Sequence, residues 1–445
     1  MELSEAVQNV PDFYAGKTVF ITGGTGFLGK ILIEKFLYSC TKLEKIYVLI
    51  RENREGSHCR IKNMLNLPIF KRLRERGEDF NKIVPITGDI MKDNLGIAEK
   101  DLEQVIEKTA IVVHLAATVR FNEPLKLAME VNFEGTRRIL NLCSRMKSLE
   151  RLVYVSTAYA HTNRDIIEEV IYPPPASYED VYAEIKKYGD NMKQVMENII
   201  NRPNTYAFTK SLTENYVAKN HPNVPVIVIR PSVVTATKNE PFEGWIDNWF
   251  GATGMLTAVG MGYIRVLFGK ASNIVDLIPV DYVTNLIIAA AAKCDRCDTI
   301  SVFNSCSSGS NPVTMEYLNK KFIEEIVRFK LNAVPYPTIT FTENPYILRT
   351  IIFIAHIVPA YILDCFLRLI GKEPRFMKKQ ERIVRLEKHL RYFTEHSWIF
   401  RSKQAESLFA SLSRKDQDTF PFDPRSIEWS QYVPVFVGGV RTHLI

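Results

Sequence analysis

Residues 18–30, TVFITGGTGFLGK, decide the fold of this 445-residue chain. A short apolar strand runs directly into three spaced glycines, which open an amphipathic helix. Gly23 permits a tight turn, Gly26 lets the backbone approach a pyrophosphate, and Gly29 lets helix and strand pack closely. The N–H groups at the helix start then face the phosphates. We therefore expect a dinucleotide site formed by Thr22, Gly23, Thr25, Gly26, Phe27, Leu28 and Gly29.

Apolar runs alternate with helical patterns from residue 17 to about residue 292. Each run is rich in Val and Ile and lacks two-residue alternation, which is typical of parallel strands buried on both faces. We therefore predict an α/β fold with a doubly wound parallel sheet, that is, a Rossmann fold. The runs are TVFITGG, KIYVLIR, KIVPITGD, AIVVHLAA, RLVYVSTAY and VPVIVIRPS.

The pattern changes after residue 311, where a helical stretch is followed by the proline-rich residues 335–345. We predict a cofactor-binding and catalytic domain over residues 1–335, with insertions that cover the substrate. A smaller, mainly helical domain is predicted over residues 346–445. The segment 172–203 is a long insertion between one strand and the next helix, at the carboxyl edge of the sheet, where ligands bind. It is either a lid or a surface elaboration.

Composition excludes several classes of protein. With 46% hydrophobic and 24% charged residues the chain is not disordered, and its net charge of +7 is too mild and dispersed to indicate nucleic-acid binding. Seven scattered cysteines make no disulfide framework, and the amino terminus lacks a secretory pattern, so we expect a protein that faces the cytosol. The pair Cys294 and Cys297 has no partner pair at metal spacing, and no histidine cluster occurs. We expect no metal.

The most apolar segment is TIIFIAHIVPAYIL, residues 350–363, bounded by Arg349 and Asp364. Fourteen residues fall short of the 18 or more that usually span a bilayer, and His356 and Pro359 interrupt them. Two interpretations remain open. The segment is a buried core helix or a pair of turns divided at Pro359, or it lies in the headgroup region of a membrane.

The end of the second strand, KIYVLIREN, indicates which nicotinamide cofactor the chain binds. A bare ribose usually meets an acidic residue at this position, whereas this chain has Arg51, with Arg54 close by. We therefore predict NADPH, whose 2′-phosphate an arginine can bind. If Glu52 rather than Arg51 points inward, the preference weakens.

Two further pairs of residues follow later strands. Asp89 and Ile90, in ITGDI, fall where an adenine pocket is expected. Ala116 and Ala117, after VVHL, are small enough to let the cofactor backbone pass. For each of these residues close packing of a loop is the alternative explanation.

The stretch TYAFTK places Tyr206 and Lys210 one helical turn apart on one face. It follows a strand that ends in VSTAY, whose Ser156 and Thr157 would lie at the carboxyl edge of the sheet. A carbonyl that accepts hydride needs a proton donor and donors aimed at the developing oxyanion. Tyr206 would donate the proton, Lys210 would lower its pKa and hold the ribose, and Thr157 or Ser156 would bind the oxygen.

The sequence resembles the extended short-chain dehydrogenase/reductases, and more closely the alcohol-forming fatty acyl-CoA reductases. The resemblance covers nearly the whole chain. It is carried by VFITGGTGFLGK, KIVPITGDI, HLAATVRFNEPLKLAMEVNFEGT, VYVSTAYA, NTYAFTK, VIRPSVV, EPFEGWIDN, DLIPVDYV, RYFTEHSWIF and FPFDPRSIEWSQY.

The resemblance implies reduction of a long-chain acyl-CoA to a primary alcohol with two NADPH, through an aldehyde that is not released. By motif position Thr157, Tyr206 and Lys210 inherit the catalytic roles. The three glycines and Arg51 inherit the cofactor roles. The resemblance also implies the cytosolic face of an intracellular membrane, endoplasmic reticulum or peroxisome, with peripheral or anchored attachment.

Two other functions use the same residues. A sugar-nucleotide epimerase or dehydratase shares the sheet, the glycine motif and the Tyr-Lys pair, but consumes no NADPH. A non-catalytic protein could use the fold to bind NADP(H) or lipid. The complete set of Thr157, Tyr206 and Lys210 argues against this second alternative.

Overall fold

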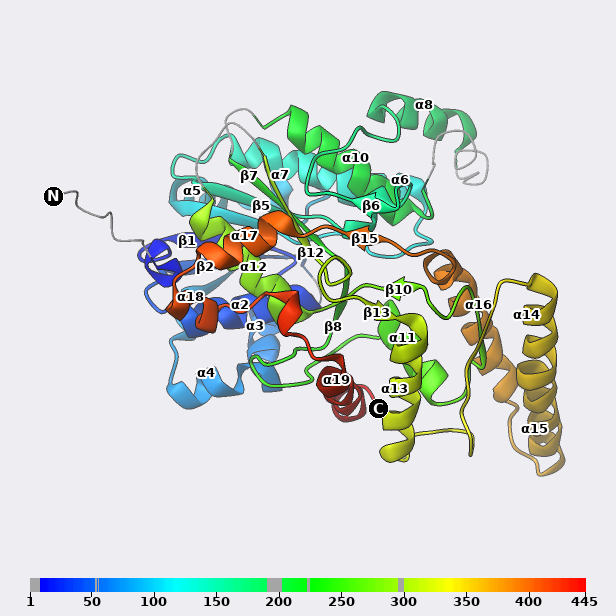
Figure 1. The fold of residues 1–445 in the computed structure, drawn as a ribbon. Coiled ribbons are helices and arrows are strands. Elements are labelled where there is room, and N and C mark those ends of the chain that lie inside the picture. The colour runs from blue at the N-terminus through cyan, green and yellow to red at the C-terminus, as the bar shows by residue number, and fades with distance from the viewer. Residues whose placement is uncertain (1–8, 53, 55, 190–201, 222–224, 295–299) are drawn as a thin grey trace. The chain divides into compact units, whose positions relative to one another are not determined.

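The computed structural model describes residues 9–52, 54, 56–189, 202–221, 225–294 and 300–445 (Figure 1). Its centre is a seven-stranded sheet in which each neighbouring pair of strands is parallel. This confirms the predicted Rossmann fold. The strand order is β12 (Ser301–Ser305), β7 (Val226–Pro231), β5 (Arg151–Val155), β4 (Thr109–His114), β1 (Thr18–Thr22), β2 (Lys45–Ile50) and β3 (Ile83–Thr87).

The order of the strands reverses beside β1, because β2 pairs with one of its edges and β4 with the other. In open parallel sheets, ligands bind outside the carboxyl ends of the strands at such a reversal. Every residue of β1, β4 and β5 is buried, as the unbroken apolar runs predict. The ends of these three strands carry the glycine loop, the alanine pair and the Ser156–Thr157 pair.

Helices cover the sheet in layers (Figure 1). α2 packs against α12, and α7 packs against α10 and β4. The helices of this part are α1 (Val10–Phe13), α2 (Phe27–Ser39), α3 (Ser57–Leu65), α4 (Lys71–Arg76), α5 (Glu99–Lys108), α6 (Leu125–Ala128), α7 (Gly135–Cys143), α8 (Tyr178–Tyr188), α10 (Thr205–Lys219), α12 (Val280–Lys293), α17 (Lys403–Ser411) and α18 (Arg414–Thr419).

The chain forms two compact units, each built from three segments. The first contains the sheet and comprises residues 1–234, 278–306 and 400–424. The second comprises residues 235–277, 307–399 and 425–445. The predicted sequence boundary between residues 335 and 346 lies inside the second unit, and the division into 1–335 and 346–445 stays a prediction.

The second unit is mainly helical. α13 packs against both α11 and α19, and α16 packs against α15. Its elements are α11 (Ala252–Gly260), β9 (Val266–Phe268), β10 (Ile274–Val275), β13 (Val313–Thr314), α13 (Met315–Arg328), β14 (Thr340–Thr342), α14 (Pro345–Ile352), α15 (Val358–Leu369), α16 (Phe376–Glu395) and α19 (Trp429–His443). Of the remaining short strands, β6 (Ile166–Ile167) belongs to the first unit. The chain passes from one unit to the other within β8 (Val233–Thr235), β11 (Leu277–Pro279) and β15 (Ile399–Phe400).

The apolar segment at residues 350–363 differs from its prediction. α14, a π-helical turn at Phe353–Ile357 and α15 form one continuous helix, Pro345–Leu369, of 25 residues. By length and composition it is long and apolar enough to cross a membrane, and only 17% of its most apolar 18 residues are buried. The expectations of a short segment, of a break at Pro359 and of a buried core helix were therefore wrong. The predicted segment ended at the charged residues Arg349 and Asp364, although the helix continues through both.

The predicted lid begins with an extended stretch and α8. Val181 on α8 packs in a small apolar cluster with residues of α6 and α10, including Leu125 and Phe208. Residues 190–201 lie outside the described part of the chain. The lid therefore stays a prediction.

Candidate functional site

The glycine loop leaves space for backbone alone. Gly23 has φ +73°, and a Cβ atom on it would lie 2.8 Å from the backbone nitrogen of Ala116. A Cβ on Gly29 would lie 2.4 Å from the carbonyl oxygen of Gly23. Gly26 donates its N–H to that same oxygen at 3.0 Å, immediately before α2 begins. The loop and the first turn of α2 therefore form a close-fitting cradle that suits the pyrophosphate of a nicotinamide dinucleotide.

A buried hydrogen-bond chain supports the cradle from below. The Thr22 hydroxyl lies 2.6 Å from Nδ1 of His114 and accepts the N–H of Ala116 at 3.2 Å. Nε2 of His114 lies 3.1 Å from the hydroxyl of Thr136 on α7. Burial, with the charge of Lys210 adding to it, lowers the pKa of His114 to about 3, so the ring is neutral. Sequence reasoning missed His114, whose partners lie 92 and 22 residues away.

Several arginines lie beyond β2. Arg51, Arg54 and Glu52 are all exposed. Burial therefore does not distinguish Arg51 from Glu52 as the residue that points toward the cofactor ribose. Arg60 on α3 reaches the glycine loop instead, since its Nη2 donates to the hydroxyl of Thr25 at 3.0 Å. No sequence motif indicates Arg60, because this residue lies outside the strand-end position where the ribose partner is expected.

The residues predicted for the adenine side follow β3 and β4. One carboxylate oxygen of Asp89 accepts the N–H of Met91 at 3.0 Å, which shapes the turn after β3. Ile90 is buried and would contact a Cβ atom on Gly135 of α7 at 3.1 Å. Ala116 lies against Gly23, as described above, and Ala117 is half-buried. These positions are compatible with cofactor contacts, and their role stays a prediction.

α10 presents Tyr206 in its first turn. Asn204 caps the helix by accepting the N–H of Ala207 at 2.8 Å. The Tyr206 ring stacks on Phe121, with ring centroids 6.2 Å apart and planes at 29°. Burial raises the pKa of Tyr206 to about 12, while a hydrogen bond with Thr157 acts in the opposite direction. The structure therefore brings Tyr206 and Thr157 together and keeps the phenol protonated near neutral pH.

Lys210 lies one turn further along α10 and is 2% exposed. Its Nζ donates to the carbonyl oxygen of Val155, the last residue of β5, at 2.7 Å, and lies 4.7 Å from the centre of the Tyr154 ring. Burial lowers the pKa of Lys210 to about 7, and Glu214 raises it. In this geometry Thr157, rather than Lys210, is the group that lowers the pKa of Tyr206.

The two candidate hydroxyls after β5 differ in their surroundings. Thr157 is buried, accepts the N–H of Tyr159 at 3.3 Å and donates to the carbonyl oxygen of Pro231 at 3.4 Å. Ser156 is also buried, and its N–H donates to the carbonyl oxygen of Ile229 on β7 at 2.8 Å. Thr157 also acts on the phenol, since it lowers the pKa of Tyr206 against the effect of burial. Which of the two hydroxyls binds the substrate oxygen stays a prediction.

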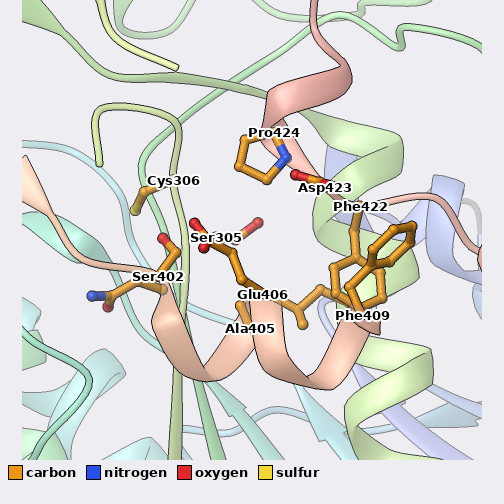
Figure 2. Close-up of a pocket in the computed structure, with 11 residues that line it drawn as sticks. Ser305, Cys306, Ser402, Ala405, Glu406, Phe409, Phe422, Asp423 and Pro424 are labelled. Carbon is orange, nitrogen blue, oxygen red and sulfur yellow. The ribbon is translucent and has the colours of Figure 1, made fainter. Parts of the chain in front are cut away.

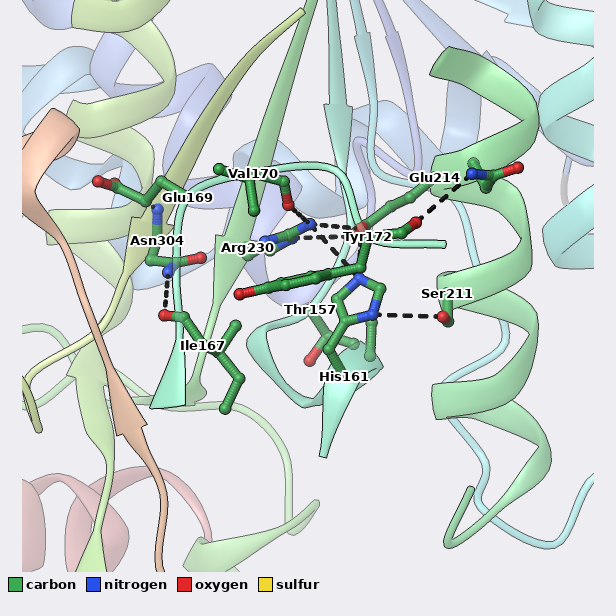
Figure 3. A network of polar contacts seen from close by, with 12 residues as sticks. Thr157, His161, Ile167, Glu169, Val170, Tyr172, Ser211, Glu214, Arg230 and Asn304 are labelled. Carbon is green, nitrogen blue, oxygen red and sulfur yellow. Dashed lines mark hydrogen bonds and ion pairs between the residues drawn. The ribbon is translucent and has the colours of Figure 1, made fainter. Parts of the chain in front are cut away.

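A buried ion-pair network joins α10 to β7 and to the loop after β5 (Figure 3). Arg230 on β7 holds the Glu214 carboxylate with two hydrogen bonds of 3.0 and 2.7 Å, and His161 lies 2.8 Å from the same carboxylate. Burial alone would raise the pKa of Glu214. Arg230 and His161 have the larger, opposite effect, and they hold the pKa of Glu214 well below its usual range. Arg230 also donates to the carbonyl oxygen of Val170 at 2.8 Å.

Sequence reasoning missed this network, although two signals for it exist. Glu214 continues the Tyr206–Lys210 spacing by another four residues on the same helix, and Arg230 interrupts an apolar strand. Asn132 was also missed. Its amide accepts the N–H of Thr118 at 2.9 Å and donates to the hydroxyl of Thr209 at 3.0 Å, which ties the loop after β4 to α10.

A small pocket elsewhere in the first unit and the metal-ligating residue types are two further candidates for a site. Figure 2 shows a pocket between β12 and α17, lined by Ser305, Cys306, Ser402 and Glu406 among others, with about 10 Å³ of free space, too little for a nucleotide. Among the described residues no group of His, Cys, Asp or Glu could hold a metal ion. Cys297, one half of the C-x-x-C pair, lies outside the described residues.

Known proteins match this chain over nearly its whole length. Two family models described as male sterility protein match residues 21–287 and 355–445. Fatty acyl-CoA reductase 1 of Homo sapiens is 36% identical over 98% of this chain and 86% of its own length. Fatty acyl-CoA reductase 2 of Mus musculus is 34% identical over 97% and 85%. The terminal R domain from the myxalamid biosynthetic pathway shares the fold, with a TM-score of 0.63 and 19% identity over 96% of this chain and 90% of that one.

Proposed function

The chain belongs to the fatty acyl-CoA reductase family and is an NAD(P)-dependent oxidoreductase, and from this premise we propose that it reduces long-chain acyl-CoA to a primary alcohol. NADPH is the proposed reductant. One NADPH and one proton convert the thioester to an aldehyde and free coenzyme A, and a second pair converts the aldehyde to the alcohol. The observation that carries the proposal is the meeting of Tyr206 and Thr157 beside Lys210, in the unit that holds the glycine cradle.

The chain's own residues supply the polar part of the chemistry. When bound, the nicotinamide cofactor supplies the hydride. The hydroxyls of Tyr206 and Thr157 donate hydrogen bonds to the substrate oxygen, on which negative charge develops. Burial raises the pKa of Tyr206 to about 12, so the phenol holds its proton at neutral pH and can donate it to the oxygen as negative charge develops there. Lys210, whose Nζ donates to the carbonyl oxygen of Val155, is the proposed donor for the nicotinamide ribose.

The test of this function is oxidation of NADPH that depends on an acyl-CoA. Purified enzyme with hexadecanoyl-CoA should show loss of absorbance at the nicotinamide band, and a UDP-sugar in its place should show none. Acyl-CoAs of several chain lengths are compared in parallel. Absence of NADPH oxidation with all of them, or turnover of the UDP-sugar instead, would contradict the proposal.

The preference for NADPH is proposed to rest on the arginines after β2. Replacing Arg51 by Ala should weaken NADPH binding by about 10- to 100-fold and change NADH binding little, because a charge-assisted hydrogen bond to the 2′-phosphate is lost. Binding is measured by titration with both cofactors. Arg328→Ala, an exposed arginine of the second unit, is the control. Equal weakening of NADPH and NADH would refute the phosphate contact.

Arg60→Ala separates two roles for the second arginine. If Arg60 binds the 2′-phosphate, its loss weakens NADPH selectively. If it only holds Thr25 in place, NADPH and NADH weaken together. The double variant with Arg51→Ala then shows whether the two arginines share the same phosphate, because the effects of residues in one network are not additive.

We place the enzyme at the cytosolic face of an intracellular membrane, endoplasmic reticulum or peroxisome. Long acyl chains and fatty alcohols partition into lipid, so such an enzyme gains from contact with a membrane surface. The exposed apolar helix Pro345–Leu369 supports this location.

A further inference from the structure

The helix Pro345–Leu369 has its polar and apolar faces reversed relative to an ordinary surface helix. Its buried stripe consists of Leu348, His356, Ala360 and Asp364, two of which are polar. Its exposed face is almost entirely apolar. The exposed large side chains of the helix and its end are Tyr346, Ile347, Phe353, Ile354, Val358, Tyr361, Ile362, Leu363, Phe366, Leu369 and Ile370.

The polar residues of the buried stripe fix how the helix is rotated. Nε2 of His356 accepts the backbone N–H of Arg265 at 3.0 Å, and burial lowers the pKa of His356 to about 4, so the ring is a neutral acceptor. The carboxylate of Asp364 accepts three N–H groups at the start of α16, those of Arg375, Phe376 and Met377, at 2.8 to 2.9 Å. These bonds turn the apolar face outward as a built feature of the fold.

Positive charge is concentrated beside this face. Residues 345–395 contain ten Lys and Arg residues against five Asp and Glu, whereas the whole chain has 57 against 50. Most of the net charge of the protein therefore lies in this segment. The exposed basic residues of α16 are Lys378, Lys379, Arg382, Arg385 and Lys388.

We propose that the helix Pro345–Leu369 lies in the plane of a membrane, with its apolar face among the acyl chains and the basic residues of α16 on anionic headgroups. Reversed amphipathicity next to a basic surface is what an interfacial helix requires. This proposal rests on the proposed function only in that a lipid substrate makes the location useful. It goes further by naming the docking surface, its orientation and the lipid charge.

Contacts within the second unit argue against a helix that spans the bilayer. α16 packs against α15, and it is a highly charged helix that hydrocarbon would not accommodate. A second copy of the chain is the other possible occupant of the apolar face. Two facing copies would bring two basic segments together, whereas anionic lipid neutralises them.

Sedimentation of the full-length protein with vesicles tests the docking surface. Vesicles of phosphatidylcholine with about 30 mol% phosphatidylserine should bind the wild type. The double variant Phe353→Glu with Ile362→Glu should bind the same vesicles with an affinity at least about tenfold lower, because it places charge where apolar contact with the acyl chains is needed. Val327→Glu, an exposed apolar position on α13, is the matched control and should bind normally. Equal binding of the double variant and the wild type would overturn the proposal.

The electrostatic part has its own comparison. Pure phosphatidylcholine, or a rise in salt from about 0.1 to about 0.5 M, should reduce binding severalfold. The triple variant Lys378→Gln, Arg382→Gln and Arg385→Gln should lose this sensitivity to phosphatidylserine. A control triple variant at Lys320, Lys321 and Lys330 of the same unit should keep it. Binding that ignores lipid charge would refute the role of α16.

Quenching by brominated lipids reports the orientation. Tryptophans introduced by Phe353→Trp and Phe366→Trp lie about 20 Å apart along the helix axis. In-plane docking predicts that shallow bromines quench both equally, whereas a spanning helix would give two different depths and overturn the proposal. A wild type that dimerises through this face, with the glutamate variant monomeric and neither bound to vesicles, would also overturn it. Vesicle binding needs no acyl-CoA, so failure of the proposed reaction would be seen separately.

Discussion

Replacing Tyr206 by Phe should lower kcat about a thousandfold, because the substitution removes the hydroxyl that donates a proton to the substrate oxygen. The ring itself remains, so its stacking on Phe121 and the packing of α10 are retained. Affinity for the nicotinamide cofactor should therefore stay within about twofold of the wild type. The measurement is the acyl-CoA-dependent rate of NADPH oxidation, combined with a cofactor titration on the same preparation.

Tyr216→Phe is the matched control for this experiment. Tyr216 lies on the same helix but packs with Phe133 and Tyr178, away from Thr157. Its loss of a hydroxyl should leave kcat unchanged. Activity that survives in Tyr206→Phe would show that the proton comes from another group, and an equal loss in both variants would show that the effect is structural.

Replacing Arg230 by Met should destabilise the first unit by about 3–5 kcal/mol. Arg230 is fully buried, and its removal leaves the carboxylate of Glu214 without its main partner in the protein interior. Thermal unfolding should shift down by about 10 °C. An exposed ion pair is the comparison, since Lys147→Met removes the partner of Glu107 at the surface and should leave thermal unfolding nearly unchanged.

A double variant distinguishes loss of the pair from loss of packing. Glu214→Gln combined with Arg230→Met removes both charges, so it should be more stable than Arg230→Met alone. Because Glu214 also raises the pKa of Lys210, Glu214→Gln should further favour uncharged Lys210 at neutral pH. A single variant as stable as the wild type would show that the buried network does not hold β7 and α10 together.

Much of the fold follows from local sequence. The strand–glycine–helix unit at residues 18–39 formed as predicted, because an apolar strand and closely packing glycines leave few alternatives. β12, with the sequence SVFNS, was not predicted because its polar residues break the apolar pattern. Its Asn304 is buried and donates to backbone carbonyl oxygens of Ile167 and Arg401, partners about a hundred residues away that no local pattern reveals.

The site was predictable to the same extent. Two sequence signals predict the centre of the candidate site: the spacing of Tyr206 and Lys210, and the strand end at Thr157. Both signals depend on regular helix and sheet geometry. The contact of Arg60 with Thr25 and the network around Glu214 depend on which distant segments meet. Local sequence therefore does not identify a unique partner for Arg60 or Glu214. The Lys210 side chain reaches the carbonyl oxygen of Val155 through its rotamer. The spacing of residues in the sequence does not determine a side-chain rotamer.

The most direct test of the proposed reaction is analysis of products and stoichiometry. The enzyme is incubated with hexadecanoyl-CoA and NADPH, and free coenzyme A, oxidised NADPH and lipid products are measured together. We expect hexadecanol as the lipid product, with two NADPH oxidised for each coenzyme A released. Accumulation of hexadecanal with one NADPH per coenzyme A, or release of coenzyme A as a free fatty acid forms without oxidation of NADPH, would contradict it.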